Sequence, residues 1–491
     1  MTPAANSEGR EPVQNQVALE ILALAEKMIH VVHLPARDRV KDRAVLEVSV
    51  PGERMTRAGH LATSDKAKSR AALEIPPQAG NVTIVVMAAA VESRARVSRR
   101  EIPVEAQLRM TKPIHEFIPR CIREIAPYVP GKPIEEVERE LNIHDAVKLA
   151  SNENPLGPSP LAVEAAKKAL EGSNRYPDGS GFYLREALSK RHEIPAEKIF
   201  LGNGSTEIID LIARLLLRPE NTGVTSHGSF PLYYIAIQAA GARLLQVPLR
   251  DYRFDLETMA RDLPPDARLV YLANPNNPTG TMFTADELDA FLARIPADVF
   301  LVLDEAYCDY VERADYSRSL DLVRRGANLM VLRTFSKVYG LAGLRIGYGL
   351  GPAKLLTEMN KIRGPFNTSG VAQAAALAAL DDAAHVRRSV DSNRAGLAQL
   401  EQGLRAQGVQ PVPSVANFIF AEFGYDTGPL AEELAKRGVI VRPMGWMGFP
   451  NALRISVGTH GENEKFLRAL ADLLPSAAAH KTETHLKGTQ K

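Results

Sequence analysis

The sequence predicts an α/β fold, in which a large unit with a mostly parallel sheet between helices is followed by a smaller α+β unit. Three observations predict it. Apolar runs alternate with helical stretches through the middle of the chain. The runs VFLVL and LMVLR show no polar alternation, as expected for strands covered on both faces. Towards the C-terminus, shorter strands and helices follow each other in a less regular order.

The elements are expected in the following order. PGKPIEEVERELNI predicts a turn and then a helix, because Pro133 suits a first helical turn and the glutamates suit the dipole at its N-terminus. A helix follows in LAVEAAKKALEG, and YPDGSGFYLREALSKRH predicts a turn and then a helix. Strands and helices then alternate. KIFLGNGS leads into TEIIDLIARLLLR, ARLVYLANP leads into a loop, and DELDAFLARI leads into DVFLVLDEAY, after which NLMVLRTFSK follows. The smaller unit would contain strands ANFIFAEF, VIVRP and NALRISVG and helices GPLAEELAKRG and NEKFLRALADLL.

The composition is that of a globular protein of two or three domains, with 491 residues and 45% hydrophobic content. A formal net charge of +2 gives no reason to expect a nucleic-acid or acidic-membrane partner. Cys121 and Cys308 are too few for a disulfide framework. The sequence has no apolar run of the roughly 20 residues that span a bilayer, and its polar N-terminus lacks a signal-peptide pattern. We therefore expect a cytoplasmic protein without a membrane partner.

The chain is expected to divide into five segments. Residues 1–109 have no repeat, motif or sustained period, and predict a poorly ordered or weakly folded extension. Met110 would make a sensible start codon, so a wrongly set start site is an open alternative there. The remaining segments are an N-terminal arm of the small domain (110–150), a large domain (151–385), a C-terminal small domain (386–475) and a tail (476–491).

Two ionisable residues end predicted buried strands. Lys337, in TFSK, could lose its charge through desolvation and act as a nucleophile, or be held covalently by a carbonyl cofactor. Asp304, in DEAY, would be costly as a buried anion unless a cation pairs with it. Taken alone, the lysine could be a surface residue and the aspartate a loop cap.

Two loops could bind ligands. NPNNPTG, residues 274–280, follows a strand where open α/β sheets bind ligands, although Asn, Pro and Gly also form ordinary turns. GNGSTE places glycines and hydroxyls directly before a helix, whose N–H groups and dipole favour an anion. Each loop alone is weak evidence.

Together, GNGSTE, NPNNPTG, DEAY, TFSK and GLRIGY resemble, in this order, the motifs of the fold-type I, aspartate-aminotransferase-like enzymes. The resemblance covers roughly residues 113–474. Within that superfamily, the stretches PGKPIEEVERE, KLASNENPLGPSP, RYPDGSG, PFNTSGVAQAAALAAL and LRISVGT are similar to the histidinol-phosphate aminotransferase family. The resemblance implies a seven-stranded, mostly parallel sheet and pyridoxal 5′-phosphate as cofactor, with no metal.

The resemblance also implies roles in catalysis. Lys337 would bond to the cofactor aldehyde and move a proton between the substrate Cα and cofactor C4′. Asp304 would keep the pyridine nitrogen protonated, which makes the ring an electron sink. Asn277 and Tyr307 would donate hydrogen bonds to the ring's 3′ oxygen. Phe230 would stack on the ring, with an ordinary core position as its alternative.

The cofactor phosphate would be bound by hydroxyls, helix N–H groups and a guanidinium fork. These belong to Ser205, Thr206, Thr334, Ser336 and Arg345. In the family, a tyrosine at the position of Tyr176 reaches the neighbouring subunit's phosphate, which implies a homodimer with shared sites. Local packing of Tyr176 is the alternative.

Three residues are expected to bind substrate. Arg454 lies inside an apolar strand and needs an anionic partner, either a substrate carboxylate or a structural acid. The family suggests that Arg442 lies near the distal group of the substrate, and that Asn154 belongs to a mobile strip that closes over it.

The predicted reaction converts L-histidinol phosphate and 2-oxoglutarate to imidazole acetol phosphate and L-glutamate, reversibly, in histidine biosynthesis. Aromatic-amino-acid aminotransferases share this framework, and phenylalanine or tyrosine is the alternative substrate. A phospho-amino-acid decarboxylase and a cofactor-sensing transcription regulator are remoter alternatives.

Overall fold

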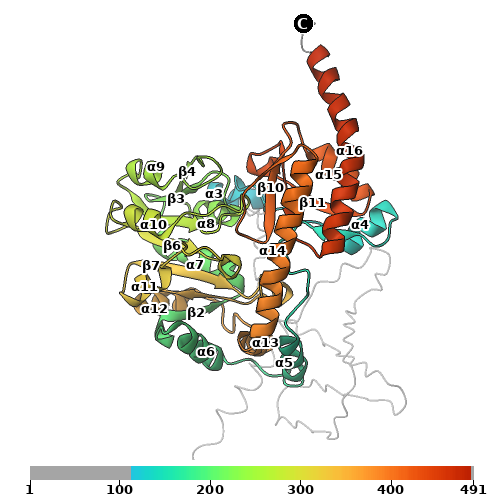
Figure 1. The fold of residues 1–491 in the computed structure, drawn as a ribbon. Helices are drawn as coiled ribbons and strands as arrows, with labels where there is room; N and C mark the ends of the chain where they lie inside the picture. The colour runs from blue at the N-terminus through green and yellow to red at the C-terminus, as the bar shows by residue number, and fades with distance from the viewer. Residues whose placement is uncertain (1–111, 488–491) are drawn as a thin grey trace, which may run out of the picture. The chain divides into compact units, whose positions relative to one another are not determined.

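The computed structural model describes residues 112–487, with side chains described as far as Leu474. The predictions for residues 1–109 and for Met110 therefore lie outside the described residues. Two sheets and their helices make up the described chain (Figure 1). Among the described residues, no helix is long and apolar enough to cross a membrane.

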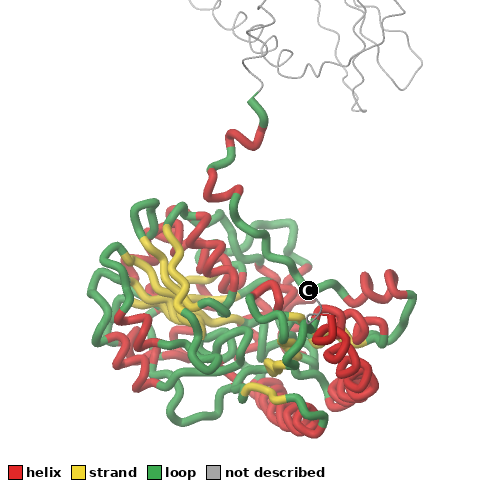
Figure 2. Tube along the Cα trace, turned by 90° about the horizontal axis from the view of Figure 1, so that it is seen from above, coloured by secondary structure: helices red, strands yellow, loops and turns green. Residues whose placement is uncertain are grey.

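A seven-stranded sheet forms the larger part, in the order β2-β8-β7-β6-β5-β3-β4. Strand β8 runs antiparallel to both of its neighbours, and the other pairings are parallel, so the predicted fold class is confirmed. Helices lie on both sides of these strands (Figure 2). The strands are β2 (Ile199–Gly202), β3 (Thr222–Ser226), β4 (Arg243–Val247), β5 (Ala267–Ala273), β6 (Phe300–Asp304), β7 (Leu329–Thr334) and β8 (Gly347–Leu350).

The central strands explain why their sequences lack polar alternation. Leu301, Val302 and Leu303 of β6 are all fully buried, as are Val331 and Leu332 of β7. Helices cover both faces, so each position of these strands meets apolar neighbours. The helices associated with this part are α5 (Pro160–Leu170), α6 (Phe182–His192), α7 (Gly204–Leu216), α8 (Pro231–Ala239), α9 (Leu256–Arg261), α10 (Ala285–Leu292), α11 (Ser319–Arg324), α12 (Ala353–Ile362) and α13 (Gly370–Leu380).

A five-stranded sheet forms the smaller part, in the order β1-β11-β12-β10-β9. Strand β1 pairs in parallel with β11, and the other pairings are antiparallel. The early part of the chain therefore joins the C-terminal sheet. The elements are β1 (Val147–Leu149), β9 (Gln410–Val412), β10 (Phe418–Glu422), β11 (Val439–Pro443) and β12 (Ala452–Ser456), with helices α4 (Ile134–Leu141), α14 (Ala383–Ala406), α15 (Gly428–Lys436) and α16 (His460–Lys487). The short helix α3 (Arg120–Arg123) contacts α8 of the larger part.

The last helix differs from the sequence prediction. The sequence prediction places a frayed tail at residues 476–491. The backbone instead stays helical as far as Lys487. The three alanines at 477–479 have the highest helix propensity of any residue, which favours continuation of the helix.

Candidate active site

Strands β5, β6 and β7 run in parallel and end at one edge of the large sheet. The residues that follow them open onto a pocket of about 300 Å³, which the small sheet also lines. Most of the predicted site residues lie there: Ser205, Thr206, Phe230, Asn277, Asp304, Tyr307, Thr334, Ser336, Lys337, Arg345, Arg442 and Arg454.

Lys337 presents its amine to this pocket. Nζ donates a hydrogen bond to the backbone oxygen of Asn152 at 3.3 Å and lies 5.4 Å from the centre of the Tyr307 ring. Burial, followed by the positive charge of Arg454, lowers the pKa of Lys337 to about 8. A larger fraction of the amine is therefore neutral near pH 7 than for a free lysine, and the neutral amine is the nucleophile.

Asp304 lies at the end of β6 and is buried. Tyr233 Oη donates to its Oδ2 at 2.8 Å, and the backbone N–H of Ala306 donates to Oδ1 at 3.1 Å. Burial raises the pKa of Asp304 to about 6 in spite of these hydrogen bonds. A cation placed against the carboxylate would stabilise its ionised form.

Hydroxyls and a guanidinium surround the start of α7. Gly204, the first residue of the helix, has a φ of +69° and donates its N–H to the Arg345 backbone oxygen at 3.0 Å. A Cβ at this glycine would collide with the Arg345 guanidinium. Arg345 Nη1 donates to Ser336 Oγ at 3.4 Å, and Thr334 Oγ1 donates to Ser336 Oγ at 3.0 Å.

This arrangement is suited to an anion. The N–H groups at the start of α7 have no intrahelical acceptors, and within the described residues the Arg345 guanidinium donates to the neutral oxygens of Ser336 and Ala342. A phosphate could accept hydrogen bonds from the helix N-terminus and the hydroxyls while it pairs with the guanidinium.

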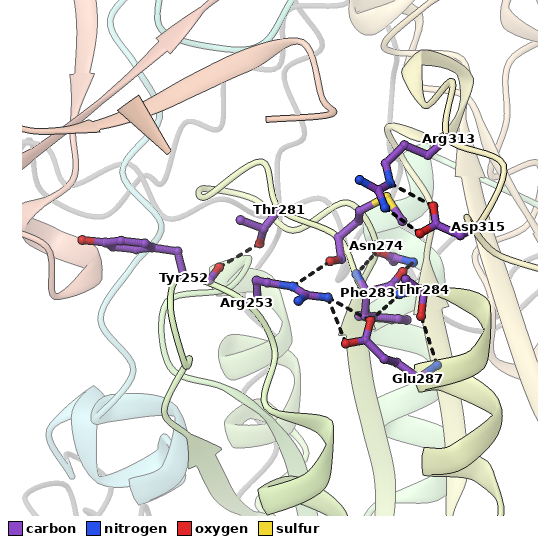
Figure 3. A network of polar contacts seen from close by, with 10 residues as sticks. Tyr252, Arg253, Asn274, Thr281, Phe283, Thr284, Glu287, Arg313 and Asp315 are labelled. Atoms are coloured by element: carbon purple, nitrogen blue, oxygen red, sulfur yellow. Dashed lines mark hydrogen bonds and ion pairs between the residues drawn. The ribbon is translucent and has the colours of Figure 1, made fainter. Parts of the chain in front are cut away.

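The NPNNPTG loop is held by a network at its base (Figure 3). Asn274 Nδ2 donates to the Phe283 backbone oxygen at 3.0 Å, and the Phe283 N–H donates to Asn274 Oδ1 at 3.0 Å. Beside them, Arg253 donates to the Met282 oxygen at 3.1 Å and pairs with Glu287 at 2.8 Å. The loop is thereby fixed to the segment before α10, and Asn277 faces the pocket.

Arg454 reaches the pocket from β12. Its Nη1 donates to Asn277 Oδ1 at 2.6 Å, and its Nη2 donates to the Ala150 oxygen at 2.5 Å. Its Nε is buried and has no hydrogen-bond partner among the described residues. The charge of this buried guanidinium is not balanced by its neutral partners, and one of its donors lacks an acceptor. An anionic ligand would pair with it.

Arg442 lies at another wall of the pocket, on β11. Its guanidinium stacks 4.9 Å from the Trp446 ring centre and donates to the Val129 oxygen. The Tyr128 ring meets Trp446 edge to face at 5.8 Å. This wall therefore combines a cation with two aromatic rings.

A family model for class I and II aminotransferases matches residues 144–470. This chain belongs to that family. The predicted resemblance is thereby confirmed, and the protein is an aminotransferase.

The relatives of this aminotransferase share a name that is more specific than that of the family. The aminotransferase is 50% identical over 353 residues to histidinol-phosphate aminotransferase 1 of Nitrosococcus oceani, covering 72% of this chain and 95% of the relative. It is 48% identical to histidinol-phosphate aminotransferase 2 of Pseudomonas aeruginosa, covering 72% and 96%. The crystal structure of histidinol-phosphate aminotransferase from Sinorhizobium meliloti, in complex with pyridoxal-5′-phosphate, matches with a TM-score of 0.68 and 31% identity, covering 73% and 98%.

Two predicted residues of the aminotransferase do not line its pocket. Asn154 turns away, because its Nδ2 donates to the Val338 oxygen and to Ser389 Oγ, both at 2.8 Å. Asn152, two residues earlier, lines the pocket instead. Tyr176 is 82% exposed and stacks on Phe366, with 4.6 Å between ring centres.

The sequence prediction also omitted Tyr233 and Asn152, although both contact predicted site residues. Tyr233 lies within the apolar stretch of α8, where a tyrosine is typical of a core position. Asn152 and Asn154 both belong to the stretch SNENP, in which nothing distinguishes one asparagine from the other. In an extended backbone, residues two apart point to the same side, so the spacing of the two asparagines offers no signal. The left-handed backbone of Asn152, with a φ of +55°, breaks this regular alternation.

Proposed function

We propose that this aminotransferase uses pyridoxal 5′-phosphate to transfer an amino group between L-histidinol phosphate and 2-oxoglutarate, in histidine biosynthesis. The names of its relatives and the cofactor of the Sinorhizobium meliloti structure support this assignment. The observation that carries it is an amine of lowered pKa, Lys337, enclosed with the Asp304 carboxylate and the partly unpaired Arg454 guanidinium.

The pocket residues fit this cofactor. The Asp304 carboxylate has neutral donors and would gain a cationic partner in the protonated pyridine nitrogen. The start of α7 and Arg345 would hold the phosphate, and the glycine at 204 leaves the space that the guanidinium needs. Lys337 would form the covalent link to the aldehyde. When bound, the cofactor supplies an electron sink for the carbanion at the substrate Cα.

The protein's own residues position the reacting groups and move the proton. Asp304 would hold a proton at the pyridine nitrogen of the bound cofactor, and Tyr233 orients the carboxylate. The amine of Lys337, once free, would act as the acid and base that moves the proton between the substrate Cα and cofactor C4′. Asn277 accepts from Arg454 through Oδ1, so its Nδ2 is available to donate to the 3′ oxygen, together with the Tyr307 hydroxyl.

Arg454 would bind an anionic group in each half-reaction. Glutamate offers a carboxylate beside the reacting carbon, whereas histidinol phosphate has none and offers its phosphate instead. A guanidinium fork can pair with either anion. Arg442 is the candidate for the group at the far end of the substrate, because it lines the same pocket next to Trp446.

We also propose a homodimer with shared sites in the cytoplasm. Tyr176 is exposed and lies outside the pocket of its own chain, as a residue given to a neighbouring site would. The low cysteine count fits a reducing compartment.

The assignment is tested with purified protein loaded with pyridoxal 5′-phosphate. Histidinol phosphate is expected to convert the bound cofactor to its amino form in a single half-reaction, faster than phenylalanine or tyrosine does. Borohydride should fix the cofactor onto Lys337, as mass spectrometry of peptides would show. Conversion by phenylalanine or tyrosine alone would instead identify an aromatic-amino-acid aminotransferase, which the Tyr128 and Trp446 rings would suit.

A further inference from the structure

Asn152 lies between three segments that are far apart in the sequence. Its Nδ2 donates to Tyr307 Oη at 3.0 Å, and its Oδ1 accepts from Ser456 Oγ at 2.9 Å. Its backbone N–H donates to the same Ser456 Oγ at 2.8 Å, and its backbone oxygen accepts from Lys337 Nζ at 3.3 Å. Asn152 is buried. One residue therefore joins β12 to the tyrosine and to the lysine of the pocket.

These hydrogen bonds have a single consistent direction. Ser456 Oγ accepts from a backbone N–H, which can only donate, so the hydroxyl proton of Ser456 is free to go to Asn152 Oδ1. The other end of the amide is then NH₂ and donates to Tyr307 Oη. Among the described residues, Tyr307 makes no other side-chain hydrogen bond, so its own proton remains available to the pocket.

The phenol keeps that proton. Burial raises the pKa of Tyr307, which favours the neutral hydroxyl. Because the Tyr307 oxygen accepts a hydrogen bond from the amide, its own O–H cannot point towards that amide. The amide thus directs the Tyr307 O–H towards another acceptor.

The backbone at this position also requires an unusual residue. Asn152 has a φ of +55°, in the left-handed region that favours glycine and, among other residues, asparagine. This conformation aims its carbonyl at Lys337 Nζ while its amide reaches Tyr307. Asparagine combines the tolerated backbone with a donor and an acceptor.

We propose that Asn152 is a positioning residue, which orients the Tyr307 hydroxyl as a hydrogen-bond donor to the cofactor's 3′ oxygen and is itself oriented by Ser456. The inference rests on the proposed function, because it needs pyridoxal 5′-phosphate linked to Lys337. Donors at the 3′ oxygen stabilise its anionic form. Loss of a well-aimed donor should therefore raise the pH at which the visible absorbance of the bound cofactor titrates.

Two uncharged variants test the proposal. Asn152→Gly removes the side chain but suits the positive φ, and leaves the carbonyl that contacts Lys337. It is expected to raise the absorbance midpoint by about half to one pH unit, as for a weakened hydrogen bond to a charged group. Ser456→Ala is expected to cause a smaller rise. Ser456 is not among the residues that line the pocket, so this rise would not come from a lost contact with the cofactor.

A double-mutant cycle shows whether the effect passes through Tyr307. Tyr307→Phe should raise the midpoint by itself, and adding Asn152→Gly should then raise it no further. Apart from Tyr307 itself, the ionisable groups around Lys337, which are Arg454, Glu153, Arg345 and Asp304, are the same in every variant of the cycle.

Asn463→Ala is the matched control. Asn463 is also fully buried and hydrogen-bonded, to Gln399 and Gly458, but lies outside the pocket. It should lower the melting temperature without moving the midpoint. A wild-type midpoint in both Asn152→Gly and Ser456→Ala, or a shift that adds in full to that of Tyr307→Phe, overturns the inference alone. Failure of the wild type to give a borohydride-fixable visible band overturns the proposed function as well.

Discussion

Asp304 and Lys337 are brought into one pocket, and burial shifts the pKa of each towards its uncharged form. The pKa of Asp304 is raised to about 6, and that of Lys337 is lowered to about 8. Both shifts arise because charge is poorly solvated there. A cofactor that places a cation against the carboxylate and bonds covalently to the amine would remove the desolvation cost of both groups. Such a cofactor should therefore stabilise the fold as well as react.

Asp304 should make the stability of the cofactor-free protein depend on pH. Its folded pKa of about 6 exceeds the unfolded value of about 3.9, so the native state binds more protons between these values. Its stabilising contribution is present below about pH 4 and is lost as the pH rises through 6. As the pH rises from about 4 to 6, the melting temperature of Asp304→Asn should therefore rise relative to that of the wild type. Thermal unfolding of the apoprotein measures this difference.

Asp262 offers a control for this measurement. Its carboxylate is on the surface, where its side-chain hydrogen bond to Arg261 lowers its pKa. Asp262→Asn should not reproduce the trend. Parallel melting curves for Asp304→Asn and the wild type at all pH values would contradict the account of Asp304. With cofactor bound, the order should reverse, because an asparagine cannot pair with the pyridinium.

At the scale of elements, the reactive residues come from the ends of parallel strands and from loops held to them. The Asn274 amide pairs with both backbone groups of Phe283 and closes the loop that carries Asn277 (Figure 3). Asn277 in turn accepts from Arg454. The position of Asn277 therefore depends on the hydrogen bonds at the base of its loop.

Asn274→Ala should affect both stability and activity. It leaves two backbone groups of the segment before α10 without partners, which should cost about 1–3 kcal/mol for each buried unsatisfied group. Because Asn277 loses its fixed position, kcat should fall as well. Chemical denaturation and steady-state kinetics measure the two effects.

Thr284→Ala is the companion variant, since it removes the N-cap of α10 beside the same network. It should cost about 1 kcal/mol and leave kcat unchanged. Equal losses of kcat in the two variants would show that general destabilisation, and not the position of Asn277, is responsible.

Strand β8 is an element that a local sequence pattern does not predict. Strand β8 is GYGL, in which glycines suggest a loop. A Cβ at Gly349 would press on Met330 of β7, and one at Gly347 would collide with the start of α7. These glycines are needed because neighbouring elements approach closely, which a local pattern does not reveal.

At the scale of the whole molecule, the proposed sharing of Tyr176 can be tested by subunit mixing. Lys337→Ala subunits lack the amine and should be inactive, and Tyr176→Ala subunits should bind the cofactor phosphate weakly. A mixed dimer would contain one site with Lys337 from one chain and Tyr176 from the other. Mixing should therefore restore activity above that of either variant at low cofactor concentration.

The control mixes Lys337→Ala with Asp304→Asn. Both residues belong to the same chain's pocket, so each site in that mixed dimer has one defect. No activity should return. Equal activities in the two mixtures, after subunit exchange has been verified by mass spectrometry, would rule out a shared site.

The sequence by itself determined the chemistry available at the strand ends. Lys337, Asp304 and the NPNNPTG loop follow apolar runs whose periodicity predicts parallel strands, and such strands end at a common edge. Local physical rules place these residues at the strand ends, because their neighbours in the chain form the strands. Their roles came from the order of the motifs, which resembles that of a known family.

Only the tertiary structure decided which distant residues contact each other in the site. Arg454 and Ser456 are brought to Asn277 and Asn152 by the pairing of β12 within the smaller sheet, and β1 joins that sheet from a segment about 300 residues earlier in the chain. Tyr233 reaches Asp304 from a helix that looked like core. Contacts across hundreds of residues depend on how the sheets pack, and no local pattern encodes that packing.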